Sequence, residues 1–276
     1  MVFRIDAGRG QKHNGCVQNP MSSQIYKQQS LMIVYDADAI PQPDRQLFDP
    51  GYWQKQGQIS GQAPGRGSAL MLETEFGSAV LKRYLRGGWA AAVSRDRYLF
   101  TGFERSRPLR EFRILQSLME MKLPVPEPLA ALCERSGMSF TGALITRRIQ
   151  PALPLAERLG DMLEARLPDC GAWSDIGACI RRFHDRGVIH ADLNARNILL
   201  HDDGSIFLID FDRARIRPGA DLACLSNLKR FQRSLHKVWP SEHRHRLENC
   251  WQYVLTGYDE AVAPPSRPGV PPGRLM

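Results

Sequence analysis

The stretch His190-Ala-Asp-Leu-Asn-Ala-Arg-Asn197, followed by Phe207-Leu-Ile-Asp210, decides the fold of this chain. It has the form H-x-D-x-x-x-x-N, and thirteen residues after the asparagine an aspartate ends a short apolar run. Phosphoryl transfer needs such a set of groups. One carboxylate orients the acceptor hydroxyl and takes its proton, while an amide oxygen and a second carboxylate hold Mg²⁺ across the phosphates.

The segment between these motifs predicts a β-hairpin. The apolar runs Ile198–Leu200 and Ile206–Ile209 flank the turn sequence Asp202-Asp-Gly204. Such a hairpin brings Asn197 and Asp210 to the same side of a cleft. We assign His190 a structural role, in which its hydrogen bonds hold the loop that carries Asp192.

This region resembles the catalytic loop and the metal-binding D-F-G motif of the protein-kinase-like fold. By that resemblance Asp192 is the catalytic aspartate, and Asn197 and Asp210 are the metal ligands. Two residues depart from the protein-kinase pattern: Ala191 replaces an arginine that contacts a phosphorylated activation loop, and Asp212 replaces a glycine. No A-P-E sequence follows. These departures favour a small-molecule or lipid kinase over a regulated Ser/Thr kinase.

The nucleotide-binding residues of the same fold are sought upstream. Val80-Leu-Lys82 resembles the V-A-I-K strand, so Lys82 is expected to contact the ATP phosphates. Glu111 has the helix position of the glutamate that pairs with this lysine, although Arg107 and Lys122 are alternative partners on the helix surface. Gly65 and Gly67 precede the first strand of a predicted hairpin, where a loop that covers the phosphates belongs.

A narrower resemblance covers residues 32 to 255. The chain resembles the bacterial 3-deoxy-D-manno-octulosonic acid (Kdo) kinase family in a set of short motifs: Phe48-Asp-Pro50 with Trp53, Tyr84-Leu-Arg-Gly-Gly88, Arg95-Asp-Arg-Tyr98, Phe100-Thr-Gly102, Arg110-Glu-Phe112, Leu123-Pro-Val-Pro126, Asp192-Leu-Asn194, Asn197-Ile-Leu-Leu200 and Ile209-Asp-Phe-Asp212. The resemblance implies phosphorylation, with ATP and Mg²⁺, of the 4-hydroxyl of Kdo on a lipid A precursor in lipopolysaccharide core synthesis. It also implies a peripheral protein at the cytoplasmic side of the inner membrane.

Two kinds of alternative remain open at this stage. The first is another kinase of the same fold that acts on heptose, an aminoglycoside or a protein. The second is a catalytically inactive nucleotide- or membrane-binding module of kinase ancestry. The presence of Lys82, Asp192, Asn197 and Asp210 together weighs against the inactive module, because a binding relic has no need to keep all four.

Composition and periodicity predict an α+β chain with two lobes. Residues 1–30 are polar and predict a disordered tail, and residues 261–276 form a proline-rich tail. A mostly β N-lobe is expected over residues 31–149, with strands at residues 31–35, 69–72, 78–84, 129–132 and 140–145 and a helix from 109 to 122. A mostly helical C-lobe is expected over residues 150–260, with helices at 155–167 and 173–186.

The net charge of +8 is unevenly distributed. Residues 82–113 contain nine basic and three acidic side chains, and residues 213–246 contain nine basic and two acidic ones. Such clusters suit a polyanionic partner, and we expect the Kdo-bearing lipid A precursor and an anionic membrane surface. Nucleic acid is not expected, because no stacking platform of aromatic residues accompanies the charge. The six scattered cysteines contain no C-x-x-C pair and favour a reducing compartment.

Overall fold

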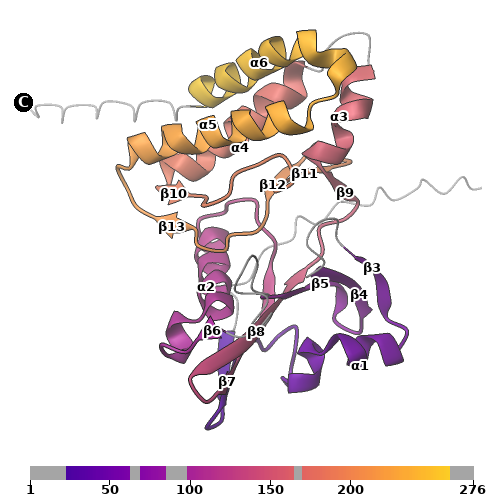
Figure 1. Ribbon diagram of the computed structural model, residues 1–276, viewed down its shortest axis with the longest axis vertical. Coiled ribbons are helices and arrows are strands. Elements are labelled where there is room, and N and C mark those ends of the chain that lie inside the picture. Colours follow the sequence, from indigo (N-terminus) through magenta and orange to yellow (C-terminus); the bar gives the residue numbers. More distant parts are fainter. Residues whose placement is uncertain (1–22, 63–68, 85–97, 165–169, 262–276) are drawn as a thin grey trace, which may run out of the picture.

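The computed structural model describes residues 23–62, 69–84, 98–164 and 170–261. A sheet-rich N-terminal part is followed by a helical C-terminal part, and the predicted hairpin of residues 198–208 lies where the two parts meet (Figure 1). The predicted α+β class is therefore confirmed. The predicted phosphate-loop residues Gly65 and Gly67 lie outside the described residues, as does the proline-rich tail after residue 261.

The N-terminal part is an antiparallel eight-stranded sheet in the order β1-β2-β7-β8-β5-β4-β3, with β6 paired to β8. Its strands are β1 (Ser23–Lys27), β2 (Leu31–Asp36), β3 (Ile59–Gln62), β4 (Ala69–Thr74), β5 (Gly77–Arg83), β6 (Tyr98–Leu99), β7 (Pro128–Ser136) and β8 (Ser139–Arg147). The strands predicted from apolar runs are all present.

Both faces of this sheet are covered, as the alternation in β2 shows. Leu31, Ile33 and Tyr35 pack into one cluster, which includes Trp53 of helix α1 (Pro50–Lys55) and Leu47 of a short 3₁₀ helix (Arg45–Phe48). Met32 and Val34 point to the opposite face, which α2 (Arg107–Glu120) covers. Because successive side chains of a strand point to opposite faces, a run of apolar residues such as 31–35 in β2 must be buried on both sides.

Helix α2 is amphipathic, and its buried side includes Phe112, Leu115 and Leu118. Pro108 stands in its first turn, where a missing N–H costs nothing. Four residues past its end, the carbonyl of Pro124 accepts a hydrogen bond from the backbone N–H of Leu208 at 3.1 Å, an ordinary N···O distance. The segment that follows α2 is thus tied to the catalytic-loop hairpin.

The C-terminal part contains α3 (Leu155–Glu164), α4 (Cys170–Asp185), α5 (Asp221–Val238), a 3₁₀ helix (Ser241–Arg246) and α6 (Leu247–Glu260). Short strands complete it: β9 (Ala152–Pro154), β10 (Val188–Ile189), β11 (Ile198–His201), β12 (Ile206–Leu208) and β13 (Arg215–Ile216). β9 pairs with β11 of the hairpin, and β10 pairs with β13. The predicted lobe boundary between residues 149 and 150 falls between β8 and β9.

The predicted N-terminal tail is wrong for its last residues. Residues 23–27 form β1, which pairs antiparallel with β2 along its whole length, so the sheet begins at residue 23 rather than 31. All five β1 side chains are exposed, so the strand has no apolar alternation to identify it in the sequence. Its hydrogen bonds to β2 hold it in place.

Two glycines set the crossing of α4 and α6. A Cβ atom at Gly177 would lie 1.9 Å from the carbonyl oxygen of Val254, and a Cβ atom at Gly257 would lie 1.9 Å from that of Ser174. The two helix backbones therefore touch directly. Around this crossing lie the buried side chains of Trp173, Ile180 and Trp251.

We predict that Gly177→Ala lowers the free energy of unfolding by about 3 kcal/mol, because the added methyl group has no space and two backbones must separate. The matched control is Gly160→Ala in α3, where a Cβ atom meets nothing within 4 Å. That change should raise stability by roughly 0.5–1 kcal/mol through helix propensity. Urea unfolding of both variants measures the difference, and equal effects would contradict the close crossing.

Candidate active site

The predicted catalytic loop, residues 190–197, lies between β10 and β11. His190 anchors this loop through both nitrogens of its imidazole ring. The imidazole Nε2 is 2.9 Å from the carbonyl oxygen of Ile209, and Nδ1 accepts the backbone N–H of Asp192 at 3.1 Å. Burial lowers the pKa of His190, so the ring is neutral and carries its proton on Nε2. The structural role predicted for His190 is consistent with these contacts.

Asn227 of α5 supports the same loop. Its side-chain oxygen accepts the backbone N–H of His190 at 2.9 Å, and its side-chain nitrogen donates to the carbonyl of His190, also at 2.9 Å. His184 of α4 lies beside this pair and contacts the Tyr258 hydroxyl at 2.9 Å. Sequence reasoning did not single out Asn227, because its importance follows only from the packing of α5 under the loop.

Asp192 presents its carboxylate to solvent while its backbone is fixed. The side-chain nitrogens of Asn194 and Asn197 both donate to the Asp192 carbonyl, at 3.0 and 2.9 Å. The Asp192 carboxylate is 61% exposed and lies 3.4 Å from the guanidinium of Arg230. This geometry leaves the carboxylate accessible to a hydroxyl that enters from outside.

The β11–β12 hairpin brings Asn197 and Asp210 together as predicted. Ile198 pairs with Leu208, and the next backbone bond joins the N–H of Ile209 to the carbonyl of Asn197 at 3.0 Å. Asp210 has a φ of +65°, a left-handed conformation that costs an L-residue of order 1 kcal/mol. The unusual backbone turns the Asp210 carboxylate toward β5 of the sheet.

Lys82 of β5 lies between two carboxylates. Its ammonium is 2.8 and 2.9 Å from the oxygens of Glu111 on α2, and 2.5 Å from Oδ1 of Asp210. Burial alone lowers the pKa of Lys82, but the charges of Glu111 and Asp210 raise it above its ordinary value. Burial likewise raises the pKa of Asp210, and Lys82 more than offsets this, so the net shift is downward. Lys82 and Asp210 are therefore both charged at neutral pH.

Glu111 is only 3% exposed, and its second partner is the hydroxyl of Tyr84, which donates to Oε2. Burial and the nearby Glu111 carboxylate raise the pKa of Tyr84 well above its ordinary value, so the hydroxyl keeps its proton. The expected pairing of Glu111 with Lys82 is thus present, and the alternative partners Arg107 and Lys122 do not contact it in the described contacts. A buried carboxylate needs such partners to stay ionised.

The D-F-D sequence continues the network. Phe211 is fully buried, with its ring stacked on Phe183 at 5.8 Å between centroids and edge-on to His190 at 4.9 Å. Asp212 accepts two hydrogen bonds from the guanidinium of Arg107, one of them from Nε at 3.0 Å. Sequence reasoning noted Asp212 as a departure from D-F-G but did not find its partner.

The donor set around the loop fits the expected magnesium ion. The Asn197 nitrogen is used by the Asp192 carbonyl, which leaves the amide oxygen for a cation, and Asp210 supplies a carboxylate from the same side. Within the residues that the structure describes, no group of three or more His, Cys, Asp or Glu side chains is arranged to hold a metal ion by itself. Mg²⁺ does not need one, because it is commonly held by one or two protein oxygens together with substrate phosphates.

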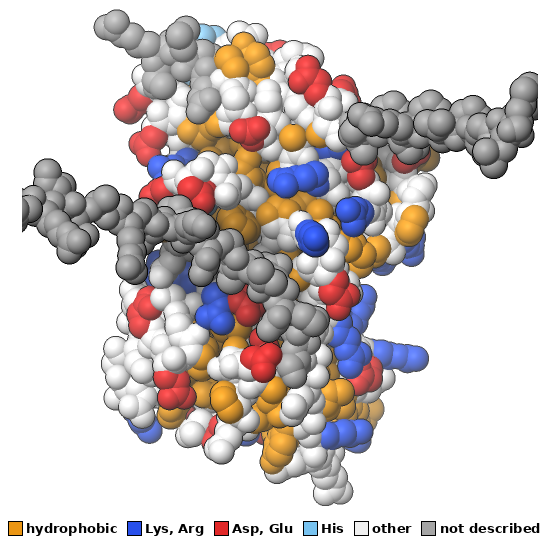
Figure 2. All heavy atoms as spheres, turned by 180° about the vertical axis from the view of Figure 1, so that it is seen from behind, with side chains coloured by type: hydrophobic (Ala, Val, Ile, Leu, Met, Phe, Trp, Pro, Cys, Tyr) orange, Lys and Arg blue, Asp and Glu red, His pale blue; other side chains and the backbone are white. Residues whose placement is uncertain are grey.

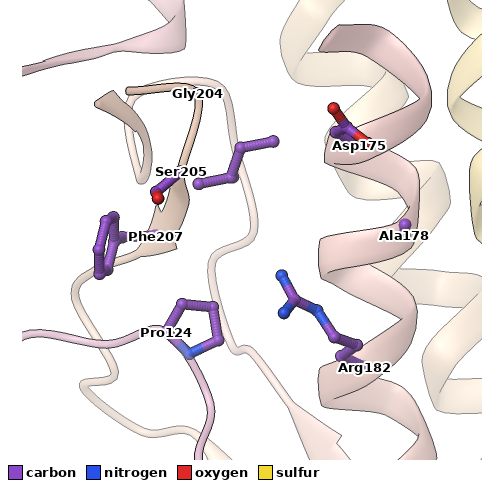
Figure 3. Close-up of a pocket in the computed structure, with 8 residues that line it drawn as sticks. Pro124, Asp175, Ala178, Arg182, Gly204, Ser205 and Phe207 are labelled. Carbon is purple, nitrogen blue, oxygen red and sulfur yellow. The ribbon is translucent and has the colours of Figure 1, made fainter. Parts of the chain in front are cut away.

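A cavity of about 360 Å³ lies on another side of the hairpin, between β12 and α4 (Figure 3). Its lining includes Pro124, Arg182 and Phe207, and the Arg182 side chain extends into it. None of Lys82, Asp192, Asn197 and Asp210 lines this cavity. The phosphoryl-transfer chemistry predicted from the sequence therefore belongs to a different place in the fold.

A strand lysine held by a helix glutamate, facing a loop that presents an aspartate and an asparagine, defines the class of protein-kinase-like phosphotransferases. Within that class, residues 51–258 match the model of the Lipopolysaccharide kinase (Kdo/WaaP) family. The match spans more than half of the chain, which therefore belongs to this family. The family expected from the sequence motifs is confirmed, and its kinase chemistry implies ATP as the phosphoryl donor.

Several named relatives are similar over most of their length. The chain is 44% identical to a 3-deoxy-D-manno-octulosonic acid kinase of Stenotrophomonas maltophilia (strain R551-3) over 230 residues, which is 83% of this chain and 90% of that protein. It is 41% identical, over the same shares, to the enzyme of that name from Xanthomonas axonopodis pv. citri. A solved structure titled WaaP in complex with acyl carrier protein aligns with 80% of this chain and 95% of its own, at 16% identity and a TM-score of 0.47.

We predict that stability falls as the pH is lowered, because burial holds His184 in its neutral form. Burial lowers its pKa from 6.5 to about 4 in the folded chain. Below pH 6.5 the unfolded state binds a proton that the folded state does not, and this difference persists down to about pH 4. The free energy of unfolding should lose about 1.4 kcal/mol per pH unit within that window from this group.

Urea unfolding at pH 7 and pH 5 measures the effect in the wild type and in His184→Gln. The variant should show a shallower pH dependence, since it has no imidazole to titrate. An unchanged slope in His184→Gln would contradict the assignment.

Proposed function

We propose that this chain is a Kdo kinase, which transfers the γ-phosphoryl group of ATP to the 4-hydroxyl of Kdo on a Kdo-lipid A precursor during lipopolysaccharide core synthesis. The observation that carries the proposal is the contact of Lys82 with both Glu111 and Asp210, in a chain whose relatives at 41–44% identity are named as Kdo kinases. An inactive module has no use for this charged arrangement, which is costly to bury.

Each residue of the site has a proposed role. Lys82, oriented by Glu111, binds the phosphates of the nucleotide, and Asn197 with Asp210 holds Mg²⁺. The metal, when bound, neutralises charge on the phosphates. Asp192 orients the acceptor hydroxyl and accepts its proton. Since the transition state is loose, positioning and charge neutralisation supply most of the rate enhancement.

Gly65 and Gly67 are proposed to belong to the loop that covers the phosphates. They fall between β3, which ends at Gln62, and β4, which begins at Ala69. These two strands pair antiparallel and lead directly to β5, which carries Lys82. A glycine-containing connection at this point lies next in the chain to the strands that approach the nucleotide site.

Arg230 is the proposed contact for the anionic acceptor. Its guanidinium lies beside the Asp192 carboxylate, and both side chains are about half exposed. An exposed ion pair of this kind adds little to the stability of the fold. The position of Arg230 beside Asp192 therefore points to a role in substrate binding. The carboxylate of Kdo is a group that such an arginine can bind while the sugar hydroxyl reaches Asp192.

We predict that Asp192→Ala lowers the rate of phosphoryl transfer by at least about 10²–10³-fold, because the proton acceptor is lost. ATP binding should stay within about threefold of the wild type, since Asp192 is not among the phosphate-binding residues. Mass spectrometry of the Kdo-lipid A precursor measures transfer, and calorimetry measures ATP binding. Asp203→Ala, in the exposed hairpin turn, is the control and should leave both unchanged.

An acceptor panel in the same assay distinguishes the substrates. Phosphate gain on Kdo, mapped to the 4-hydroxyl, is the expected result. Gain only on heptose, an aminoglycoside or a protein would overturn the choice of acceptor while leaving the kinase intact. Loss of transfer in Asp203→Ala equal to that in Asp192→Ala would contradict the role given to Asp192.

We also propose that the outer face of α5 rests on the anionic cytoplasmic surface of the inner membrane. None of the described helices is long and apolar enough to cross a bilayer. Leu222 and Leu225 are 82% and 52% exposed, and Lys229, Arg233 and His236 follow them on the same helix face. A helix with exposed leucines beside basic residues suits the boundary between acyl chains and anionic headgroups. On the face shown in Figure 2, by contrast, acidic and basic side chains are interspersed.

We predict that Lys229→Glu combined with Arg233→Glu weakens binding to phosphatidylglycerol vesicles at least tenfold, because each basic residue near an anionic surface contributes about 1 kcal/mol. Lys55→Glu in α1, also an exposed lysine, is the control and should bind as the wild type does. Cosedimentation with vesicles measures the effect. Equal binding of the double variant and the wild type would rule out this face.

A further inference from the structure

Arg107 contacts the D-F-D motif, and none of the roles proposed above accounts for these contacts. Its guanidinium donates two hydrogen bonds to the Asp212 carboxylate and one, at 2.8 Å, to the Tyr98 hydroxyl. It also lies over the rings of Tyr84 and Tyr98, with its central carbon 5.3 and 5.2 Å from their centroids. The Arg107 and Asp212 side chains are only 27% and 14% exposed. A bidentate, partly buried arginine–carboxylate pair of this kind fixes the relative orientation of its two side chains.

The position of Arg107 in α2 is locally unfavourable. Arg107 is the first residue of the helix, where the positive end of the helix dipole disfavours a cation. Asp212 brings a carboxylate to the same end, which both the dipole and the guanidinium favour. The tertiary contact therefore explains a residue that helix formation alone does not.

The pair gives α2 a second attachment to the D-F-D motif. Arg107 and Glu111 are four residues apart, so both lie on one side of the helix. Glu111 reaches Asp210 through the ammonium of Lys82, while Arg107 reaches Asp212 directly. Between the two aspartates, the ring of Phe211 is fixed in the core. The Tyr84 ring lies between the two attachments, under the charges of Lys82 and Arg107.

We propose that Arg107 and Asp212 are positioning residues that hold α2 in the arrangement required for transfer, so that this kinase needs no phosphorylated loop to set Glu111 against Lys82. In regulated protein kinases, a new phosphate–arginine contact controls the placement of this helix. Here the carboxylate of Asp212, which stands in place of the D-F-G glycine, pairs with Arg107 without any phosphorylation. The inference rests on the proposed roles of Lys82 and Glu111.

The test uses Arg107→Met, which keeps the aliphatic stem, and Asp212→Asn, which keeps the shape of the side chain. We expect each variant to lower kcat/KM for ATP by about 10–100-fold, with both a higher KM and a lower kcat, because a displaced α2 leaves Lys82 poorly placed. The double variant R107M/D212N should be no worse than either single variant, since all three lack the same contact.

A matched control is Arg113→Met on the same helix. Arg113 pairs with Glu104 at the surface and does not contact the D-F-D motif in the described contacts. This variant should keep the wild-type kcat and KM. If Arg107→Met is too unstable to assay, Asp212→Asn, which removes no apolar volume, decides the question. Circular dichroism and thermal unfolding show which variants are folded under assay conditions.

A simple loss of folded protein would lower the apparent kcat and leave KM for ATP unchanged, and that result would overturn the inference. Variants R107M and D212N with kcat/KM within twofold of the wild type, or with losses that add in the double variant, would also overturn it. Lys82→Met separates the two proposals. If Lys82→Met abolishes transfer while R107M keeps the kcat/KM of the wild type, only the positioning role fails. If Lys82→Met keeps full activity, the proposed site itself fails.

Discussion

The rest of the candidate active site depends on one partly buried ammonium group. Lys82 attracts Glu111 from the helix side and Asp210 from the hairpin side, and it thereby joins three segments that are distant in the sequence. Without it, two carboxylates would face each other across a partly desolvated space, where like charges repel strongly. The sheet, α2 and the β11–β12 hairpin are therefore fixed relative to one another by charge as well as by the apolar core that they share.

The sequence was sufficient to predict the local features of this site. The spacing of Asp192, Asn197 and Asp210 depends on a loop and a hairpin, both of which are short-range structures with their own turn residues. The pairing of Lys82 with Glu111 followed from the family resemblance, which placed one on a strand and the other on a helix. The buried strands were equally predictable, because their apolar residues form uninterrupted runs.

What the sequence did not reveal are contacts between side chains whose separation in the chain is large. Arg107 and Asp212 are 105 residues apart, and Asn227 lies 37 residues from His190. In both pairs, the sequence around one residue contains nothing that indicates the other residue as its partner. Strand β1 escaped prediction for a related reason: it is held by backbone hydrogen bonds to β2, and its side chains are all exposed, so no alternation marks it. Gly65 and Gly67 lie outside the described residues and remain predictions.

The close crossing of α4 and α6 also bears on how the protein is made. Helix α4 leads through Gly187 into β10 and the catalytic loop, but its backbone packs against Val254 and Tyr258 near the end of the described chain. During synthesis, the loop that carries Asp192 leaves the ribosome well before the helix against which its support must pack. The N-terminal sheet can fold early, whereas the catalytic loop acquires its final support only when residues through Tyr258 have emerged. Competence for phosphoryl transfer is thus acquired after the sheet has formed, once α6 has been synthesised.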